Sequence, residues 1–302
     1  MDSPFDRSLD DFGNIVHLEH VNIRQPDQRL ATLFYVLGLG FTRDPYLMVG
    51  LDNMWINIGR NQIHMPTGAP MVLRGTICVV MPGREALLKR LAEVASLLAA
   101  TRFGFDAQAD HVSATCPWGN RFRIFEPGER YGRMRLGLPS VELDVARGTA
   151  AGIATFYREV MGALVSEHSD AQGACASIGV GPGQTLVYRE GDAAPAPYDN
   201  HHVQIYVNDF SGPYRRLRAL GLVTQEDDAY QYRFRQLVDP ATSAPLTVLE
   251  HEVRSLLHPL YGRPLVNRNP EMTNRNYAAG EESFRCWVLP ATSSAVAECE
   301  SV

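Results

Sequence analysis

The pattern of hydrophobic and polar residues along the chain changes several times between a period of two residues and the spacing of a helix. Stretches in which every second residue is apolar predict strands, and stretches with apolar residues three and four apart predict helices. The first predicted strand covers residues 18–23, and the helix after it begins near Asp27. The order of strand, helix and two or three further strands returns at intervals of roughly 60–65 residues, which indicates an internal repeat.

Four such units account for most of the chain. The predicted strands are residues 18–23, 54–58, 61–65, 75–80, 111–115, 121–125, 140–145, 185–188, 202–207, 232–235 and 246–249, and the longer predicted helices are 84–98 and 212–220. We expect the units at residues 14–68, 74–128, 138–192 and 199–253, followed by a C-terminal strap and tail at 254–302.

Composition narrows the class of protein. The chain has 302 residues, of which 45% are hydrophobic and 21% charged, and this is enough to bury a full core. The net charge is −6, and no basic block is interleaved with aromatic residues, so neither nucleic acid nor a membrane surface is expected as a partner. We expect a small-molecule substrate, and a monomer and a homo-oligomer both remain open.

The chain ends and the cysteines indicate a cytoplasmic location. The acidic, polar N-terminus lacks the positive end and apolar run of a secretory signal, and no stretch approaches the ~20 apolar residues of a membrane span. The five cysteines are odd in number and form no C-x-x-C pair. Reduced thiols fit this pattern better than a disulfide framework or a zinc finger.

Strand alternation places several polar side chains on the face opposite the apolar one. Successive side chains of a strand point to opposite faces, so His202, Gln204 and Tyr206 lie together, away from the neighbouring valines and isoleucine. The same rule groups His20 with its neighbours Asn22 and Arg24, and it turns His64 away from the core. Three histidines are therefore predicted on polar faces of neighbouring strands, where imidazoles can bind a divalent metal.

Four short motifs carry a family resemblance. They are the L-x-H-V-x-I segment from Leu18 to Ile23, Phe34-Tyr35 followed by Leu39-Gly40-Phe41, the Gly119-Asn120 turn, and the Asp239-Pro240 turn ahead of Glu250. Over residues 14–255 the chain resembles the vicinal oxygen chelate superfamily, which includes glyoxalase I, extradiol dioxygenases and bleomycin-binding proteins. The resemblance implies an α+β fold in which four βαβββ units pair into two curved, barrel-like mixed sheets with the helices outside.

The resemblance also implies which positions bind the metal, namely one on the first strand and one on the last strand of each paired unit. Carried over to this chain, these positions are His20 and His64, Thr76 and Arg123, Ser140 and a residue near Val187, and His202 and Glu250. Strand alternation does not show which face Glu250 occupies. Its assignment as a ligand is implied by the resemblance, since a glutamate on the last strand is a recurrent ligand in the family. Pairing of the first unit with the fourth would unite His20, His64, His202 and Glu250 in one site, and we favour it.

The number of protein ligands separates two chemistries. Four ligands leave two open positions, enough for a chelating substrate, whereas three leave room for a substrate and O2. We expect a non-haem Fe(II) dioxygenase, with Ni(II), Zn(II) or Mn(II) as alternative metals. A glyoxalase-type isomerase or lyase and a non-catalytic binding or resistance protein are the alternatives. His64 and Tyr206 are candidate catalytic residues; Asn22, Arg24, Gln204 and Tyr206 are candidate substrate contacts or, equally, solvated polar residues.

Overall fold

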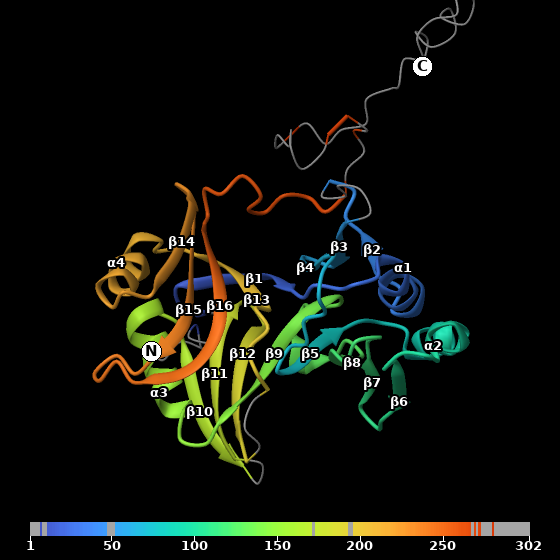
Figure 1. The fold of residues 1–302 in the computed structure, drawn as a ribbon, viewed down its shortest axis with the longest axis horizontal. Helices are drawn as coiled ribbons and strands as arrows, with labels where there is room; N and C mark the ends of the chain where they lie inside the picture. The colour runs from blue at the N-terminus through green and yellow to red at the C-terminus, as the bar shows by residue number, and fades with distance from the viewer. Residues whose placement is uncertain are drawn as a thin grey trace, which may run out of the picture.

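The computed structural model describes residues 7, 11–46, 52–170, 173–192, 196–266, 269, 271–272 and 280. Within these ranges the chain forms four repeats, each with a strand, a helix and three further strands (Figure 1). The end of the predicted tail, from residue 281 onward, lies outside the described residues, and Cys286 and Cys299 lie there with it.

The first two repeats occupy the N-terminal half. Their elements are β1 (Ile15–Asn22), α1 (Gln28–Ala31), η2 (Thr32–Gly38), β2 (Thr42–Arg43), β3 (Asn53–Ile58), β4 (Asn61–Pro66), β5 (Gly75–Val80), α2 (Arg84–Leu98), β6 (Gly104–Ala107), β7 (His111–Thr115) and β8 (Arg121–Phe125), with the 3-10 turn η3 (Glu129–Tyr131) after them. The carboxylate of Asp27 accepts hydrogen bonds from the backbone amides of Arg29 and Leu30, which explains why the first helix begins there.

The last two repeats follow the same order. Their elements are β9 (Gly137–Ala146), α3 (Ala150–Phe156), η4 (Tyr157–Met161), β10 (Val165–Asp170), β11 (Gly173–Gly181), β12 (Gln184–Gly191), β13 (His202–Val207), α4 (Ser211–Ala219), β14 (Val223–Asp228), β15 (Gln231–Val238) and β16 (Pro245–Ser255). In the first and third repeats an α-helix continues as a π-helix, η2 and η4, and each π segment carries a buried tyrosine, Tyr35 or Tyr157. Strand β16 runs two residues beyond the predicted end of the fourth unit.

The strands form two eight-stranded mixed sheets, curved and open rather than closed (Figure 1). The first sheet has the order β14-β15-β16-β13-β1-β4-β3-β2, and the second has the order β10-β11-β12-β9-β5-β8-β7-β6. Strands β1 and β13 pair antiparallel at the centre of the first sheet, so the first repeat is joined to the fourth, as expected. The second repeat is joined to the third in the same way through β5 and β9.

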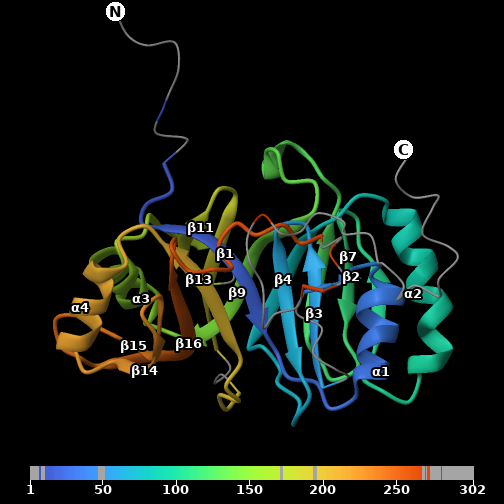
Figure 2. The ribbon, with the colours of Figure 1, turned by 90° about the horizontal axis from the view of Figure 1, so that it is seen from above.

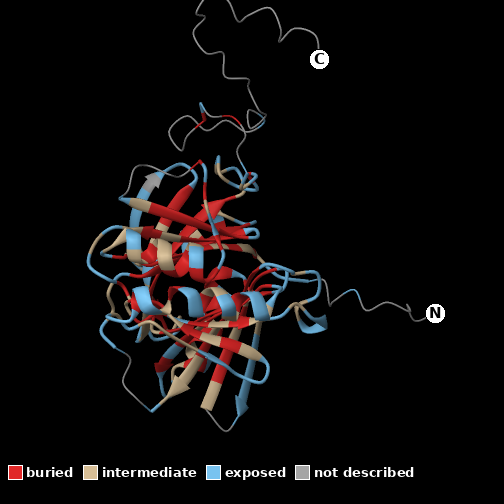
Figure 3. Cartoon of the chain, turned by 90° about the vertical axis from the view of Figure 1, so that its right-hand side faces the viewer, coloured by how far each residue is buried: buried red, intermediate tan, exposed pale blue. Residues whose placement is uncertain are grey.

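The helices lie outside the sheets, as predicted. Helix α1 lies beside α2 at one end of the molecule, and α3 lies beside α4 at the other (Figure 2). Buried residues are concentrated in the sheets, whereas the outward faces of the helices are exposed (Figure 3). The apolar faces of both sheets contribute to a single core that includes Val21, Ile63, Val203 and Ile205. The opposite face of the first sheet is therefore the one that remains for polar side chains.

Four of the strands that the sequence pattern did not identify are edge strands. Strands β2 and β14 end the first sheet, and β6 and β10 end the second. Strand β10 has the sequence Val-Ser-Glu-His-Ser-Asp, and all of it except Val165 is exposed. Edge strands are commonly short and polar because they face solvent on one side, so they lack the apolar alternation that identifies a central strand. The fifth such strand, β11, lies inside its sheet and is rich in glycine and alanine.

A buried chain of hydrogen bonds ties the two sheets together. Nδ1 of His251 on β16 donates to the carbonyl oxygen of Leu249 at 2.8 Å, so Nε2 accepts from the hydroxyl of Tyr157, 2.5 Å away. The Tyr157 hydroxyl in turn lies 2.6 Å from that of Tyr188 on β12. Burial lowers the pKa of His251 to about 4, which keeps the imidazole neutral at pH 7.

Two further features of the described ranges concern the cysteines and the helices. Cys78, Cys116 and Cys175 are buried free thiols. Among the described residues, no helix has both the length and the apolar character that crossing a membrane requires.

Candidate metal centre

Three buried side chains meet on the polar face of the first sheet. They are His20 on β1, His202 on β13 and Glu252 on β16, and one potential ligand atom of each lies within 4.8 Å of the other two. Their residues are 1%, 7% and 2% exposed, so solvent does not compete strongly for these atoms. Two imidazole nitrogens and one carboxylate oxygen form a set that suits Fe(II) and also Zn(II). Among the described residues, this is the group whose geometry fits a metal ion.

The ring of His20 is oriented by its sequence neighbour. Oε2 of Glu19 lies 2.5 Å from Nδ1 of His20, which leaves Nε2 as the outward nitrogen, and this buried Nε2 has no hydrogen-bond partner. Burial alone would raise the pKa of Glu19, but His20, Arg254 and Arg263 lower it to about 2, so Glu19 is ionised. A carboxylate behind an imidazole fixes the tautomer and orientation of metal-binding histidines.

The ring of His202 is held more loosely and is neutral. Its Nδ1 lies 3.7 Å from Oε1 of Glu250, and its Nε2 lies 3.7 Å from Oε2 of Glu252. Burial, with the neighbouring His20 and Arg233, lowers the pKa of His202 well below 6.5. The neutral imidazole is the form that binds a metal, and Nε2 has no hydrogen-bond partner. Nε2 of His20 and Nε2 of His202 are thus buried, without hydrogen-bond partners and close to the carboxylate of Glu252. A bound cation would satisfy all three groups, and this observation supports a metal site.

Arginine side chains surround the two glutamates of β16. Arg233 bonds Oε1 of Glu250 at 2.8 Å and also bonds Oε2 of Glu252, so it bridges the two carboxylates. Arg254 lies 2.5 Å from Oε1 of Glu252, and Arg235 lies 2.9 Å from Oε2 of Glu250. Each glutamate is therefore bonded to two guanidinium groups, and what separates them is position, because the ligand atoms that lie within 4.8 Å of one another belong to His20, His202 and Glu252. The sequence predicted Glu250 as the ligand, whereas the structure brings Glu252 to the two histidines.

Strand register explains why the closer glutamate is Glu252. In the first repeat, His64 on β4 pairs with Asn22, two residues beyond His20. In the fourth repeat, the residue that pairs two positions beyond His202 is Glu252, because it lies opposite Gln204. Glu252 and His64 therefore occupy equivalent positions, and Glu250 corresponds to Gln62 of the first repeat. His64 follows His20 by 44 residues and Glu252 follows His202 by 50, so spacing along the chain does not identify Glu252, and the strand register is needed.

His64 lies beside the trio, with both of its ring nitrogens occupied. Asn22 donates to Nδ1 at 2.6 Å, and Nε2 lies 2.7 Å from Oδ1 of Asn53. The ring stacks on Trp55 with 3.7 Å between centroids, and its centroid is 5.9 Å from that of His20. Burial lowers the pKa of His64 well below 6.5. In this arrangement His64 is a neutral neighbour of the trio and not a fourth member of it.

The predicted substrate contacts lie at different distances from the trio. Gln204 pairs with His20 across β1 and with Glu252 across β16, and both ends of its fully buried amide lack a hydrogen-bond partner. The side-chain amide of Asn22 is hydrogen-bonded to His64. Arg24 follows the end of β1, and no hydrogen bond or ion pair of the described residues joins it to the trio. Gln204 is therefore the predicted contact that is best placed beside the candidate ligands.

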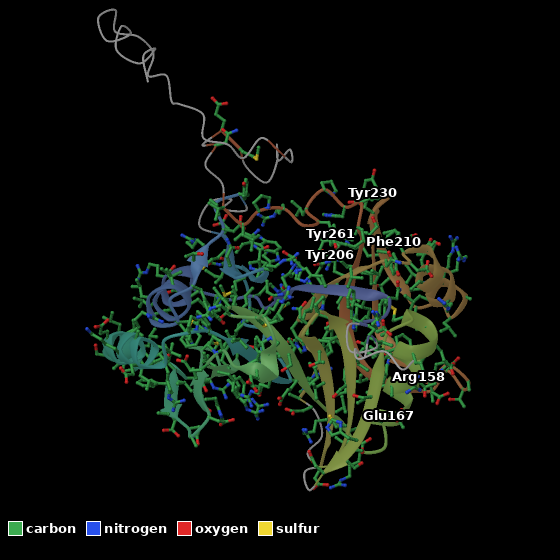
Figure 4. All side chains as sticks on the ribbon, turned by 180° about the vertical axis from the view of Figure 1, so that it is seen from behind. Arg158, Glu167, Tyr206, Phe210, Tyr230 and Tyr261 are labelled. Carbon is green, nitrogen blue, oxygen red and sulfur yellow. The ribbon has the colours of Figure 1, made fainter. Side chains whose placement is uncertain are left out.

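Tyr206 lies at the end of the polar face that the C-terminal strap covers. The strap consists of residues 256–266 and crosses from β16 back towards the first repeat (Figure 1). The ring of Tyr206 lies 4.8 Å from that of Tyr261, and the two appear side by side in Figure 4. Burial raises the pKa of Tyr206, so its hydroxyl stays protonated. The strap contributes a side of the site that the strand pattern could not predict.

Arg263 anchors the strap to the first repeat. Its Nη2 lies 2.8 Å from Oδ2 of Asp44 and 3.3 Å from Oε1 of Gln62, and the side chains of the Arg263–Asp44 pair are 3% and 0% exposed. Asn57 and Tyr46 also donate hydrogen bonds to the backbone of the strap, at 3.1 and 2.9 Å. The segment therefore acts as a structural strap.

Comparisons with known proteins agree on the fold. No protein-family model matches the chain, and no curated protein is significantly similar in sequence. Among solved structures, a "putative dioxygenase" from Bacillus subtilis superposes with a TM-score of 0.54 at 13% identity, covering 87% of this chain and 89% of that one. Glyoxalase I from Zea mays superposes with a TM-score of 0.54 at 14% identity, covering 79% and 92%. The chain therefore shares the fold of these two structures, which agrees with the fold that the sequence resemblance implied.

Proposed function

We propose that the chain is a metal-dependent enzyme that binds Fe(II) through His20, His202 and Glu252. In this proposal it acts as a dioxygenase on a small vicinally oxygenated or aromatic substrate. Bound Fe(II) would act as a Lewis acid toward adjacent substrate oxygens and would supply the redox chemistry that O2 requires. The two structural relatives have names from both dioxygenase and glyoxalase chemistry, so the fold supports an enzyme of this group without separating the two reactions.

The state of His64 is the observation that carries the preference for a dioxygenase. Two buried histidines and one glutamate converge, while both nitrogens of His64 bond to asparagine side chains. Three protein ligands leave three positions of an octahedral shell, enough for a chelating substrate and O2. A four-ligand site would require His64 to give up at least one of these hydrogen bonds, because a ring nitrogen that binds the metal cannot keep its asparagine partner. We therefore favour the three-ligand site.

In this proposal, each of the side chains around the metal would have a separate role. Glu19 holds the tautomer of His20 by accepting from Nδ1, and Gln204 offers its unpartnered amide to the substrate. Of the two candidate catalytic residues, His64 lies nearer to the trio than Tyr206 and is the candidate acid–base group. Tyr206 lies four residues along β13 from His202, about 13 Å at the rise of a strand, so a contact with substrate would occur at the strap end of the site.

A glyoxalase-type isomerase or lyase is the second candidate. The observation that favours it is the 5.9 Å between the ring centres of His64 and His20, since a reorientation of the His64 side chain would complete a four-ligand site. Four ligands leave two positions, which is enough for a chelating substrate without O2.

Metal content and oxygen uptake separate these candidates. The protein should be purified anaerobically, loaded with Fe(II), and tested with a catechol and a hydroxyketone in an oxygen electrode. We expect one iron per chain and substrate-dependent O2 uptake. Nickel or zinc without O2 uptake would support the isomerase or lyase, and no bound metal would support a non-catalytic binding protein. His202→Ala should lose the metal, while Cys175→Ala, which alters a buried thiol in the second sheet, should retain it.

A further inference from the structure

Strand β1 contains a β-bulge directly before the candidate ligand His20. In the pairing with β13, Leu18 and His20 lie opposite the consecutive residues Ile205 and Gln204, so Glu19 is an extra residue between them. A regular strand would turn Glu19 and His20 to opposite faces of the sheet. The bulge removes this alternation, and Oε2 of Glu19 lies 2.5 Å from Nδ1 of His20. The contact that orients the His20 ring therefore depends on the bulge.

Two buried side-chain amides hold the backbone on one side of this bulge. Strand β1 pairs with β4 from His20 onward, so Leu18 comes before that ladder. The backbone N–H of Leu18 donates to Oε1 of Gln184 at 3.2 Å. Its carbonyl oxygen accepts from Nδ2 of Asn61 at 2.6 Å and from Nε2 of Gln184 at 3.1 Å. Gln184 and Asn61 are 4% and 2% exposed, and they supply the partners that a neighbouring strand would otherwise give to Leu18.

The same two amides bind the second sheet. Nε2 of Gln184 also donates to the carbonyl oxygen of Leu138 on β9 at 3.1 Å, and Oδ1 of Asn61 accepts from the backbone N–H of Leu138 at 2.9 Å. Oε1 of Gln184 lies 3.0 Å from Nδ1 of His17 as well, so the Gln184 amide uses all four of its hydrogen-bonding positions. Gln184 begins β12 of the third repeat, and it therefore joins the second sheet to the strand that carries His20.

We propose that Gln184 is a positioning residue for the candidate metal centre, which acts through the bulge at Glu19 on the orientation of His20. This inference rests on the proposed metal-binding function. It gives a role in that function to the second sheet, where Thr76 and Ser140 stand at the positions that correspond to His20 and His202.

The physical reason is the cost of an unsatisfied backbone group. Without the Gln184 amide, the buried N–H of Leu18 has no acceptor, and a buried donor without a partner is costly. The segment then has to move to regain a hydrogen bond, and Glu19 follows Leu18 directly along the chain. A carboxylate that leaves Nδ1 of His20 no longer fixes the tautomer and orientation of that ring.

Asn120 is a matched control, because its amide has a similar setting away from the trio. It is fully buried, accepts from the backbone N–H of Leu73 at 2.8 Å, and donates to the carbonyl oxygen of Met71 at 2.9 Å. Leu73 and Met71 lie between β4 and β5, outside the strands that carry the trio. Removal of the Asn120 amide should therefore lower stability without altering the metal centre.

The test is anaerobic titration of the full chain with Co(II), whose visible absorption reports the geometry of its ligands. Gln184→Met keeps the length of the side chain and removes the amide. We expect this variant to bind Co(II) about 10-fold more weakly or worse, with a changed spectrum. Asn120→Leu should bind Co(II) within about twofold of the unmodified protein, because the two sites share no partner, although urea titrations should show that both variants are destabilised.

A double variant separates action through Glu19 from a general effect. Glu19→Gln removes the carboxylate directly and should also weaken Co(II) by about 10-fold or more. If Gln184 acts through Glu19, the combination of Gln184→Met with Glu19→Gln should bind Co(II) little more weakly than either single variant, because the same contact is lost in each. Independent effects would multiply to about 100-fold. If Gln184→Met does not fold, Asn61→Leu, which removes the other amide, replaces it in the same comparison.

The possible failures differ in what they overturn. If the unmodified protein binds Co(II) and Gln184→Met binds it as tightly, Gln184 is not a positioning residue, while the proposed metal centre stands. Multiplying losses in the double variant, or an equal loss in Asn120→Leu, would overturn the inference in the same way. If the unmodified protein does not bind Co(II), the proposed function itself fails, and the inference fails with it.

Discussion

The two glutamates of β16 offer a sharp test of the ligand assignment, because they are two residues apart on one strand and their side chains point to the same face of the sheet. The matched changes are Glu252→Gln and Glu250→Gln. Each removes one negative charge and keeps the shape of the side chain. Both side chains are nearly buried, at 3% and 11% exposed, so a difference between the variants cannot be attributed to solvent exposure.

The expected magnitudes follow from distance. Oε1 of Glu250 lies 3.7 Å from the far nitrogen of His202, and a cation sits about 2 Å beyond the near one, so roughly 7 Å separates Glu250 from the cation. Coulomb attraction falls inversely with distance, so at one dielectric the charge of Glu250 attracts the cation about a third as strongly as a ligand charge at about 2.1 Å. At the effective dielectric of about 20 that suits buried sites, the loss on Glu250→Gln is at most about 5 kcal/mol, and the loss on Glu252→Gln is about three times larger.

The assay is competition for Fe(II) against a chelator under anaerobic conditions, with elemental analysis of the washed protein and circular dichroism to confirm folding. We expect Glu252→Gln to lose the metal and Glu250→Gln to retain it. The reverse result, with metal lost only in Glu250→Gln, would identify Glu250 as the ligand and refute the register argument. Equal retention in both variants would refute a carboxylate ligand on this strand.

Three further outcomes can be measured independently. His64→Gln should retain one metal per chain, since both ring nitrogens bond to asparagines; loss of the metal in elemental analysis would support the four-ligand site. The pKa of His251 is about 4 in the folded chain and 6.5 as a free group, so between these pH values only the unfolded state binds the proton. The free energy of unfolding should therefore fall by about 3 kcal/mol as the pH falls from 7 to 4, and urea titrations should show a shallower fall for His251→Gln; equal slopes would contradict this. Arg263→Met should destabilise the fold by about 3–5 kcal/mol because the buried carboxylate of Asp44 loses its ion pair with Arg263, whereas the double variant with Asp44→Leu should recover most of that loss in the same titrations.

Sequence reasoning predicted the parts of the molecule that depend on local pattern. Helix α2 and strands β5, β7, β8 and β13 have the predicted bounds, because each shows a clear apolar period over its whole length. The side that each strand turns to the core also followed from alternation: Val203 and Ile205 enter the core, while His202 and Gln204 lie on the opposite face. The pairing of the first repeat with the fourth was inferred from where the histidines fall, and the strand order confirms it.

The tertiary structure decided which polar groups meet. Glu250 and Glu252 have the same parity, and only the pairing of β16 with β13 brings Glu252 level with Gln204 and close to His20 and His202. The hydrogen bonds of His64 and the anchoring of the strap by Arg263 join residues that are far apart along the chain. Local periodicity determines which face of a strand a side chain occupies. Register between strands is set by all of their contacts at once, so the membership of the site became visible only in the folded chain.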